Sequence, residues 1–410
     1  MKAAAEQTLT RTALLEFSAR QDFRFNQHNA GPAAAQSGRA GERYVTSSEQ
    51  FANAVLAKNP AAFRILSTAK QLPCLAPARW RDTDYAGKRV LFLLPSQALG
   101  NNVATLLFLQ AFREQRGVRA VGVFCARSTA DIYLSLGGVE TYTLWVGAKE
   151  LKRWDVLIDL GQLEARRDID IWPVDMEIEL LEALDLKPSP RFPSEARPLP
   201  NDRPLKLGVL PLASSPLRTL PASTTLALVE ALAPLGQVTL CLNRTQHQGV
   251  LLARALAERL PPGVAVIDAF SSIGELLRAI DGFDYAVFAD SGPAHMSKLF
   301  ATPGVAVYTS APGDVLQGRF TNLARWTVPF QGPHCAAPCG LAKLRQDAHS
   351  RVGCMGSLGL ALEALPRVPA RQDPQLVERL MAEPVPCVAQ LAREPDALVR
   401  FVLADLERRR

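Results

Sequence analysis

Long apolar runs are missing from this 410-residue sequence. No stretch approaches the roughly 18 or more consecutive apolar residues of a membrane-spanning helix. The opening stretch MKAAAEQTLTRTALLEF carries Glu6 and Arg11 where a secretory signal peptide has its apolar core. We therefore expect a cytoplasmic protein whose seven cysteines are reduced thiols.

Clusters of basic residues are also scarce. The formal net charge of +6 favours anionic partners such as nucleotides, phosphorylated lipids or a membrane surface, although a basic balance also serves solubility alone. Lys and Arg are scattered along the chain, and the only dense run is Arg408 to Arg410. No nucleic-acid-binding motif is present. We expect no nucleic-acid partner, and a peripheral association with the inner face of a membrane stays open.

The first 87 residues show little patterning. The segment FNQHNAGPAAAQSGRAGERY is rich in small and polar residues and indicates a flexible stretch. The segment SSEQFANAVLAKNPAAFRILSTAKQL, residues 47–72, has capping signals and helical spacing. We predict an N-terminal extension over residues 1–87 that is flexible in part and then helical.

From Arg89 onward, apolar strands alternate with helices. RVLFLLP, AVGVF and DVLIDL are predicted as strands, with a helix over GNNVATLLFLQAFREQ. This pattern is typical of a parallel sheet covered on both faces. We predict a first Rossmann-like domain over residues 88–186.

A second series of the same kind follows a proline-rich linker. Six prolines between Lys187 and Pro204 block regular structure, so residues 187–204 are predicted to be a linker. Strands LKLGVLP, VTLCL, VAVI, DYAVFA and GVAVY then alternate with helices over residues 205–375, and residues 376–410 form a helical tail. The predicted fold class is α/β, with two Rossmann-like domains facing a central cleft where ligands bind at the carboxyl ends of the strands.

The segment DSGPAHMSKL, which follows strand DYAVFA, combines in a few positions residues that end a strand and start a helix. Asp290 ends the strand, Ser291 suits a helix cap, Gly292 permits close backbone approach and Pro293 suits the first helical turn. A helix N-terminus directs free N–H groups and a positive dipole end toward an anion, so the segment predicts a phosphate site. His295, on the same turn, can donate a hydrogen bond to phosphate. A well-capped helix with a surface histidine explains the segment equally well.

This segment resembles the D-(S/T)-G-x-x-H donor motif of the bacterial heptosyltransferases, glycosyltransferase family 9. The stretches LGVLPLASSPLRTLPASTTLALVEAL, FSSIGELLRAIDGFDYAVFADSG and RVLFLLPSQALGNNVATLLFLQAFREQ resemble further parts of that family. The likeness extends over about residues 88 to 365. It implies the GT-B architecture and inverting transfer of a sugar, often a heptose, from a nucleotide-diphosphate donor to a hydroxyl of a glycan, a lipid-linked or lipopolysaccharide-type acceptor, or a protein.

The resemblance also assigns roles to single residues. Asp290, Ser291, Gly292 and His295 would bind the donor, together with Ser214 in the small-polar loop. Arg218 stands where the family has a basic residue, usually Lys, and would meet the diphosphate, although Leu220 replaces the usual aromatic residue. Arg218 and His295 would stabilise the leaving group, so no cofactor would be required for catalysis.

The predicted acceptor loop departs from the family. Gly100 is kept, but Asn101, followed by Asn102, replaces the usual catalytic aspartate, and a neutral amide cannot accept a proton from a hydroxyl. Three interpretations follow. Another carboxylate such as Asp131, Glu140 or Asp159 is the base; the acceptor needs only orientation, which leaves that role to Asn101; or the protein binds a nucleotide sugar without turnover.

The cysteines of the second half raise a separate question. Cys335, Cys339 and Cys354, with His334 adjacent, have a spacing that suits ligands of zinc or iron, and some protein-modifying members of the resembled family bind iron through cysteines. Reduced thiols packed in a loop are the alternative, and the remaining cysteines are expected to be ordinary core or surface thiols. Two rival functions stay open: a nucleotide-sugar epimerase of the same architecture, and a catalytically silent binding or scaffold protein.

Overall fold

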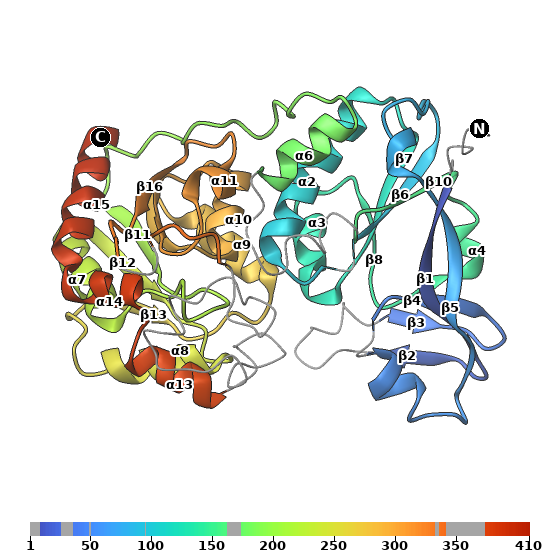
Figure 1. Cartoon of the computed structure of the whole chain (residues 1–410), viewed down its shortest axis with the longest axis horizontal. Helices are drawn as coiled ribbons and strands as arrows, with labels where there is room; N and C mark the ends of the chain where they lie inside the picture. Colours follow the sequence, from blue (N-terminus) through green and yellow to red (C-terminus); the bar gives the residue numbers. More distant parts are fainter. Residues whose placement is uncertain are drawn as a thin grey trace. The chain divides into compact units, whose positions relative to one another are not determined.

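The computed structural model describes residues 9–25, 36–48, 51–94, 96–161, 174–332, 336–341 and 374–410 (Figure 1). The chain divides into two compact units. Unit 1 comprises residues 1–165, 176–189 and 271–274, and unit 2 comprises residues 166–175, 190–270 and 275–410. None of the described helices is long and apolar enough to cross a membrane.

Unit 1 begins with an antiparallel sheet. Its strand order is β5-β1-β4-β9. The strands are β1 (Leu9–Ala19), β4 (Arg43–Thr46), β5 (Phe63–Leu75) and β9 (Val146–Gly147), and a separate pair is formed by β2 (Phe23–Phe25) and β3 (Gln36–Gly38). Two short helical turns, the π-helical η2 (Ala52–Leu56) and the 3₁₀ turn η3 (Pro77–Arg79), are the helical elements in the described part of residues 1–87.

The predicted helical second part of the N-terminal extension is therefore wrong. Pro60 stops the helical pattern that starts at Phe51, and β5 begins at Phe63. The long strand β1 supplies a pairing partner along the whole length of β5, which local spacing cannot reveal. Aromatic side chains then fill this sheet's core. They are Phe17, Phe23, Phe25, Tyr44, Phe51, Phe63 and Trp145.

A parallel sheet follows in unit 1, with strand order β10-β6-β7-β8. The strands are β6 (Arg89–Leu94), β7 (Ala120–Cys125), β8 (Glu140–Tyr142) and β10 (Val156–Asp159). The helices are α2 (Leu99–Gln115), η4 (Arg127–Thr129), α3 (Ala130–Leu136), α4 (Ala148–Leu151) and α6 (Met176–Ala183).

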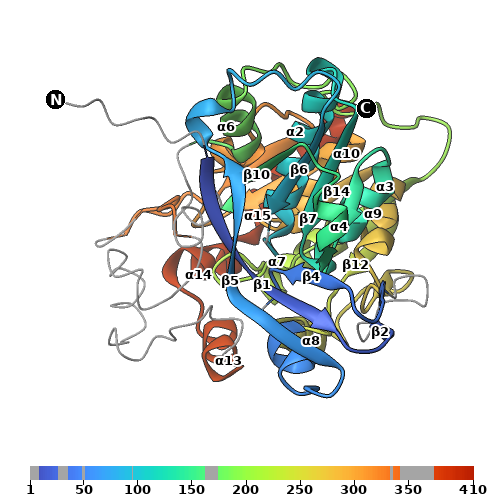
Figure 2. The same cartoon turned by 90° about the vertical axis from the view of Figure 1, so that its right-hand side faces the viewer.

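A helix packs on one face of this parallel sheet and the antiparallel sheet packs on the other. Phe92 packs edge-on against Phe108 and Phe112 of α2. The opposite face, which includes Leu91 and Leu93, shares one buried cluster with residues of the antiparallel sheet. Those residues are Leu14, Val45, Leu72, Cys74 and Val146. Figure 2 looks onto β1, β4 and β5 with β6, β7 and β10 labelled nearby. The N-terminal sheet thus replaces a layer of helices.

Unit 2 is built on a six-stranded parallel sheet of order β13-β12-β11-β14-β15-β16. The strands are β11 (Leu205–Leu210), β12 (Gly236–Cys241), β13 (Ala265–Ile267), β14 (Tyr285–Ala289), β15 (Gly304–Tyr308) and β16 (Leu323–Thr327). The connecting helices are α7 (Ala222–Leu232), η5 (Ala233–Leu235), α8 (His247–Leu256), α9 (Ile273–Gly282), α10 (Gly292–Phe300) and α11 (Gly313–Gln317).

The C-terminal helices complete the core of unit 2. They are α13 (Pro374–Ala382), α14 (Pro386–Arg393) and α15 (Pro395–Arg409). Leu398, Val402 and Leu406 of α15 are buried in the same cluster as the strands. Residues 187–204 contain turns and bends but no helix or strand. The strand order reverses direction between β11 and β14, the place in such sheets where ligands bind beyond the carboxyl ends.

Candidate functional site

The donor motif lies at this switch point of unit 2. The loop after β11 carries Ser214 and Arg218, and the neighbouring strand β14 ends just before Asp290. Arg218 Nη1 lies 3.3 Å from Asp290 Oδ2, and Arg218 Nη2 donates a hydrogen bond of 3.0 Å to Ser214 Oγ. The structure therefore brings these three predicted residues together, although they are 76 positions apart in the sequence at most.

The ion pair between Arg218 and Asp290 is largely buried. The side chain of Asp290 is 1% exposed and that of Arg218 is 12% exposed. Burial raises the pKa of Asp290, and the charge of Arg218 opposes that rise. A carboxylate repels phosphate, so in this arrangement Asp290 orients Arg218, whose guanidinium has further N–H donors for an anion.

His295 lies on the first turn of α10, one turn beyond Asp290. Burial, together with the positive charges of Lys298 and Arg218, lowers the pKa of His295 well below its usual value. The imidazole is therefore neutral near pH 7 and offers one N–H donor and one acceptor. Lys298 is itself buried, donates to the carbonyl of Leu316 at 2.7 Å and lies 3.7 Å from Asp175 Oδ2.

The predicted side-chain cap of α10 is not formed. Ser291 takes the N-cap position, but its hydroxyl donates to the carbonyl of Ala289 at 3.1 Å. The backbone carbonyl of Ser291 accepts the N–H groups of Ala294 and His295, and Pro293 has no N–H. Among the described residues, the N–H groups of Ser291 and Gly292 have no partner. Two donors at a positive helix end thus stay available for an anion.

The predicted acceptor loop in unit 1 is part of a helix. Gly100, Asn101 and Asn102 belong to the first turn of α2. Asn101 Nδ2 lies 3.5 Å from Ser96 Oγ. Asn102 is fully buried: its amide donates to the carbonyls of Ser96 (3.2 Å) and Ala98 (2.9 Å), and its Oδ1 accepts the Tyr133 hydroxyl at 2.9 Å. Asn102 therefore fixes the turn, and Asn101 is the member whose side chain is partly exposed.

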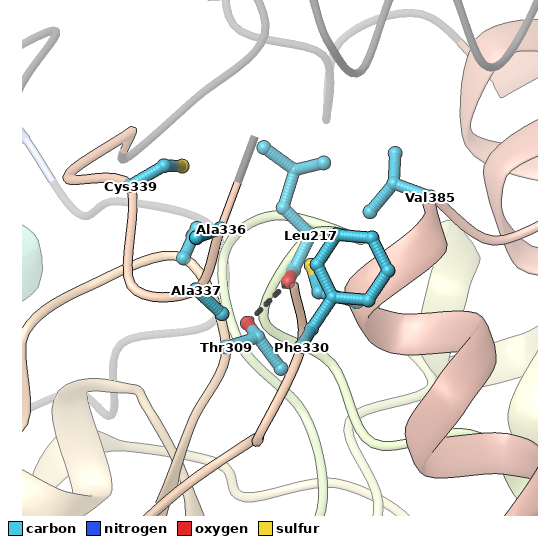
Figure 3. Close-up of a pocket in the computed structure, with 9 residues that line it drawn as sticks. Leu217, Thr309, Phe330, Ala336, Ala337, Cys339 and Val385 are labelled. Carbon is cyan, nitrogen blue, oxygen red and sulfur yellow. Dashed lines mark hydrogen bonds between the residues drawn. The ribbon is translucent and has the colours of Figure 1, made fainter. Parts of the chain in front are cut away.

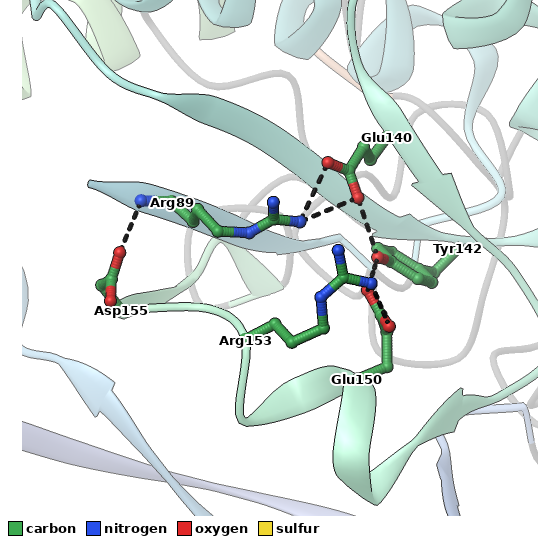
Figure 4. Close-up of polar contacts among 6 residues, drawn as sticks. All are labelled: Arg89, Glu140, Tyr142, Glu150, Arg153 and Asp155. Atoms are coloured by element: carbon green, nitrogen blue, oxygen red, sulfur yellow. Dashed lines mark hydrogen bonds and ion pairs between the residues drawn. The ribbon is translucent and has the colours of Figure 1, made fainter. Parts of the chain in front are cut away.

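The sheet separates the three carboxylates that the sequence offers as bases. Asp159 ends β10 and Asp131 opens α3 after β7, so both follow carboxyl ends of strands, as Asn101 does. Glu140 begins β8, and its carboxylate pairs with Arg89, the first residue of β6, at 3.0 Å (Figure 4). Five residue steps of strand, about 17 Å, separate that edge from the end of β6.

Glu140 is also occupied by a polar network at that amino edge. Its Oε2 lies 3.1 Å from the Tyr142 hydroxyl, which donates to Glu150 at 2.7 Å. Arg153 pairs with Glu150 at 2.8 Å (Figure 4). Glu140 is thus a structural partner remote from Asn101, whereas Asp131 and Asp159 lie at the same edge of the sheet as Asn101.

The cysteine cluster is only partly described. Cys335 and Cys354, with His334, lie outside the described residues. Cys339 is a partly buried free thiol that lines a small cavity with Cys387 of α14, and the cavity of about 10 Å³ has room for about one water-sized group (Figure 3). No group of three or more His, Cys, Asp or Glu side chains able to hold a metal ion occurs within the described ranges.

Three residues near these sites were not singled out from the sequence. Cys387 lies 48 positions beyond Cys339, too far for a spacing argument, and α14 brings it to the same cavity. Ser310 lines that cavity too, and its buried hydroxyl has no hydrogen-bond partner within the part of the chain that the structure describes. Tyr133 reads in the sequence as an ordinary core aromatic, and only its hydrogen bond to Asn102 distinguishes it.

Comparison with known proteins supports the fold. No family model matches the chain, and no curated protein matches it. The solved structure of TibC, titled as a dodecameric iron-containing heptosyltransferase in complex with ADP-D-β-D-heptose, matches with a TM-score of 0.50 at 10% identity, covering 99% of this chain and 97% of that one.

Two further solved structures show lower scores. They are E. coli heptosyltransferase WaaC with ADP (TM-score 0.44, 16% identity, 59% of this chain and 93% of that one) and a glycosyl transferase family 9 structure from Veillonella parvula DSM 2008 (TM-score 0.46, 14% identity, 73% and 99%). The match to TibC extends over nearly the whole chain, the N-terminal sheet included. The chain therefore has the fold of this glycosyltransferase, and the predicted α/β, GT-B fold class is confirmed.

Proposed function

We propose that this protein is a glycosyltransferase that moves a sugar from a nucleotide-diphosphate donor to an acceptor hydroxyl, with inversion. The observation that carries the proposal is the cluster of Ser214, Arg218 and the buried Asp290 beside the N-terminus of α10, at the switch point of a parallel sheet. The fold shared with TibC, whose structure contains ADP-D-β-D-heptose, makes a heptose the first donor sugar to test.

The donor side supplies fixed positive groups for the leaving diphosphate. As the bond from the sugar to the diphosphate breaks, negative charge grows on the phosphate oxygens. Arg218, the two free N–H groups at Ser291 and Gly292, and the N–H of neutral His295 then donate to those oxygens. Donors held in place before the reaction need no reorganisation, and each contributes roughly 3 kcal/mol to such sites.

The acceptor side needs a proton acceptor other than Asn101. The acceptor hydroxyl, on a glycan, a lipid-linked sugar or a protein, loses its proton as its oxygen attacks the sugar carbon. Asn101 can orient this hydroxyl through its amide, and Asp159 or Asp131 takes the proton. Asp159 is the first choice, because it is the last residue of β10, which pairs directly with β6. Asp131 lies six residues beyond the end of β7, and its Oδ2 already accepts the N–H of Gly274 at 2.9 Å.

A structural metal is a separate part of the proposal. Cys339 would hold zinc or iron together with Cys335 and Cys354, and Cys387 is a further thiol at the same cavity. The metal would stabilise the loop and the start of α14, with no part in sugar transfer. Elemental analysis of protein purified without added metal tests this: about one equivalent in the parent and loss in Cys339→Ser support it, whereas less than a tenth of an equivalent in the parent contradicts it.

Donor binding is tested by calorimetry with ADP, UDP and GDP, followed by their sugar conjugates, and then by an assay for sugar release and transfer. We expect binding of one nucleoside diphosphate that weakens at least tenfold in Arg218→Lys, which keeps the charge but loses the fork of donors. Arg254→Ala, at an exposed arginine of α8, is the matched control and leaves the affinity unchanged. No binding by the parent protein would refute the proposed donor site.

A second candidate, a nucleotide-sugar-binding protein without turnover, is favoured by Asn101 alone. It predicts donor binding with the same dependence on Arg218 and neither release nor transfer of the sugar. The binding measurement therefore gives the same result for both functions, and the assay for sugar release and transfer distinguishes them.

A further inference from the structure

A hollow lies along the free edge of the sheet in unit 2. Of the strands that the structure describes, β16 is the outermost of this sheet and pairs with β15 alone. The hollow has a volume of about 540 Å³. Its lining includes the consecutive residues Leu323, Ala324 and Arg325. Consecutive strand residues point to opposite faces, so the hollow follows the backbone edge of β16 rather than one face of the sheet.

The hydrogen-bond pattern shows which backbone groups meet this hollow. Gly304 donates its N–H to Asn322, and Val328 donates to Tyr308, so the even-numbered residues of this strand direct their backbone groups toward β15. Leu323, Arg325 and Thr327 consequently direct theirs outward. Among the described residues, none of these outward N–H and C=O groups has a hydrogen-bond partner.

Two residues before Leu323, the chain already pairs with this edge. Thr321 donates its N–H to the carbonyl of Ser194 at 2.8 Å, and its hydroxyl reaches the same oxygen at 3.3 Å. Glu195 and Ala196 then line the hollow without continuing the ladder. The linker thus satisfies the edge at Thr321 and leaves it open from Leu323 onward.

In the long edge strand β5 of unit 1, by contrast, side chains bond to backbone groups of the edge. In β5, the N–H of Ala69 donates to Ser67 Oγ and its carbonyl accepts Gln71 Nε2, each at 3.2 Å, and Pro73 has no N–H. Side chains of β5 therefore occupy edge groups that a foreign strand would need. Within the described ranges, no side chain bonds to the outward backbone groups of Arg325 or Thr327 in β16.

The hollow is lined by more positive than negative side chains. Arg325, Arg408 and Arg409 line it, with Glu195 as the opposing charge. Arg408 and Arg409 both pair with the buried carboxylate of Asp405. Arg409 is 16% exposed, whereas Arg408 is 71% exposed and keeps part of its guanidinium open to solvent. Arg325 pairs with Asp314, which is 88% exposed, and such a surface pair contributes little free energy. Arg325 can therefore exchange Asp314 for a carboxylate of a partner at little cost.

We propose that this edge binds an extended, acidic segment of a partner protein, which adds to the sheet as a further strand. Main-chain hydrogen bonds to Arg325 and Thr327 hold the segment, and its carboxylates meet Arg325 and Arg408. The proposal concerns a surface distinct from the donor site. The open edge starts at Leu323, the amino end of β16, whereas the donor cluster of Ser214, Arg218 and Asp290 follows the carboxyl ends of β11 and β14.

The test uses the full chain and a displayed library of random peptides of about 12 residues, from which binders are synthesised and measured by fluorescence anisotropy. Three variants at one position separate the contributions. Arg325→Ala removes the charge, Arg325→Glu reverses it, and Arg325→Pro removes both the charge and the outward N–H without touching the ladder to β15. Thermal unfolding confirms that each variant is folded.

We expect the parent to select acidic, strand-forming peptides. Their affinity should fall about tenfold in Arg325→Ala, further in Arg325→Pro, and most in Arg325→Glu. Equal affinities for Arg325→Pro and Arg325→Ala would overturn the added strand, and absence of acidic binders would overturn the proposal as a whole. Binding to phosphatidylglycerol vesicles that Arg325→Glu abolishes, without any selected peptide, would overturn it in favour of a membrane surface.

Discussion

The turn after β11 and the turn after β6 occupy corresponding places in two parallel sheets, yet they are built differently. The first holds a buried ion pair, Arg218 with Asp290. The second holds a network of neutral groups, in which Asn102 bonds to Tyr133 and to two backbone carbonyls. The turn in unit 2 thus holds fixed charges, whereas the turn in unit 1 holds neutral amide and hydroxyl groups, which cannot take up a proton near pH 7.

The largest effect is expected when the ion pair is broken. Arg218→Ala leaves the carboxylate of Asp290 buried without its counter-ion, which costs about 3 to 5 kcal/mol of folding free energy. The double variant Arg218→Ala with Asp290→Asn should recover part of that loss, because the remaining amide carries no charge. Urea unfolding measures both. Equal stabilities of the single variant and the parent would mean that the pair is not buried in solution.

The next effect concerns turnover and depends on the proposed transfer reaction. Asp159→Asn should lower kcat by about 100-fold or more, because general base catalysis contributes at least that factor. Glu140→Gln, at the opposite edge of the same sheet, is the matched control and should leave kcat unchanged. A loss in Asp131→Asn instead would move the base to α3. Unchanged turnover in both aspartate variants would leave orientation by Asn101 as the only role of this turn.

The neutral network is tested through Tyr133. Tyr133→Phe leaves the buried Oδ1 of Asn102 without a donor, which should cost about 1 to 3 kcal/mol of folding free energy. Tyr142→Phe, at the partly exposed amino edge, provides the comparison and should cost less. The free energies come from denaturant unfolding. The reverse order of the two losses would contradict the description of the turn after β6 as fixed by Asn102.

The smallest effect is a pH dependence at His295. The pKa of His295 is lowered in the folded protein, so below about pH 6.5 the unfolded chain takes up a proton that the native chain does not, and stability is lost as the pH falls. His295→Gln does not titrate. Its melting temperature should therefore fall less between about pH 7.5 and about pH 5.5 than that of the parent. Identical falls in calorimetric scans would count against a neutral imidazole at His295 in the folded protein.

The sequence predicted the parallel sheets because their strands are continuous apolar runs bounded by turns, as in RVLFLLP and DYAVFA. It also predicted that Arg218 and Asp290 belong to one site, through the resemblance to a known family. It failed at residues 47–72, where β5 depends on pairing with β1, more than 40 positions away in the chain. Likewise, no local pattern separates Glu140 from Asp159, because only the strand direction assigns them to opposite edges.

The contact between the N-terminal sheet and β6 has consequences for folding during synthesis and for truncated forms of the protein. Strand β4 pairs with β9, so the first sheet is complete only after about 147 residues have left the ribosome. Leu91, Leu93, Phe124 and Trp154 stay uncovered until β1 and β5 pack against them. A chain that begins at residue 88 would keep this apolar face open to water and would precipitate or recruit chaperones. We therefore expect a shortened form of this protein to stay soluble only if it retains residues 9–75.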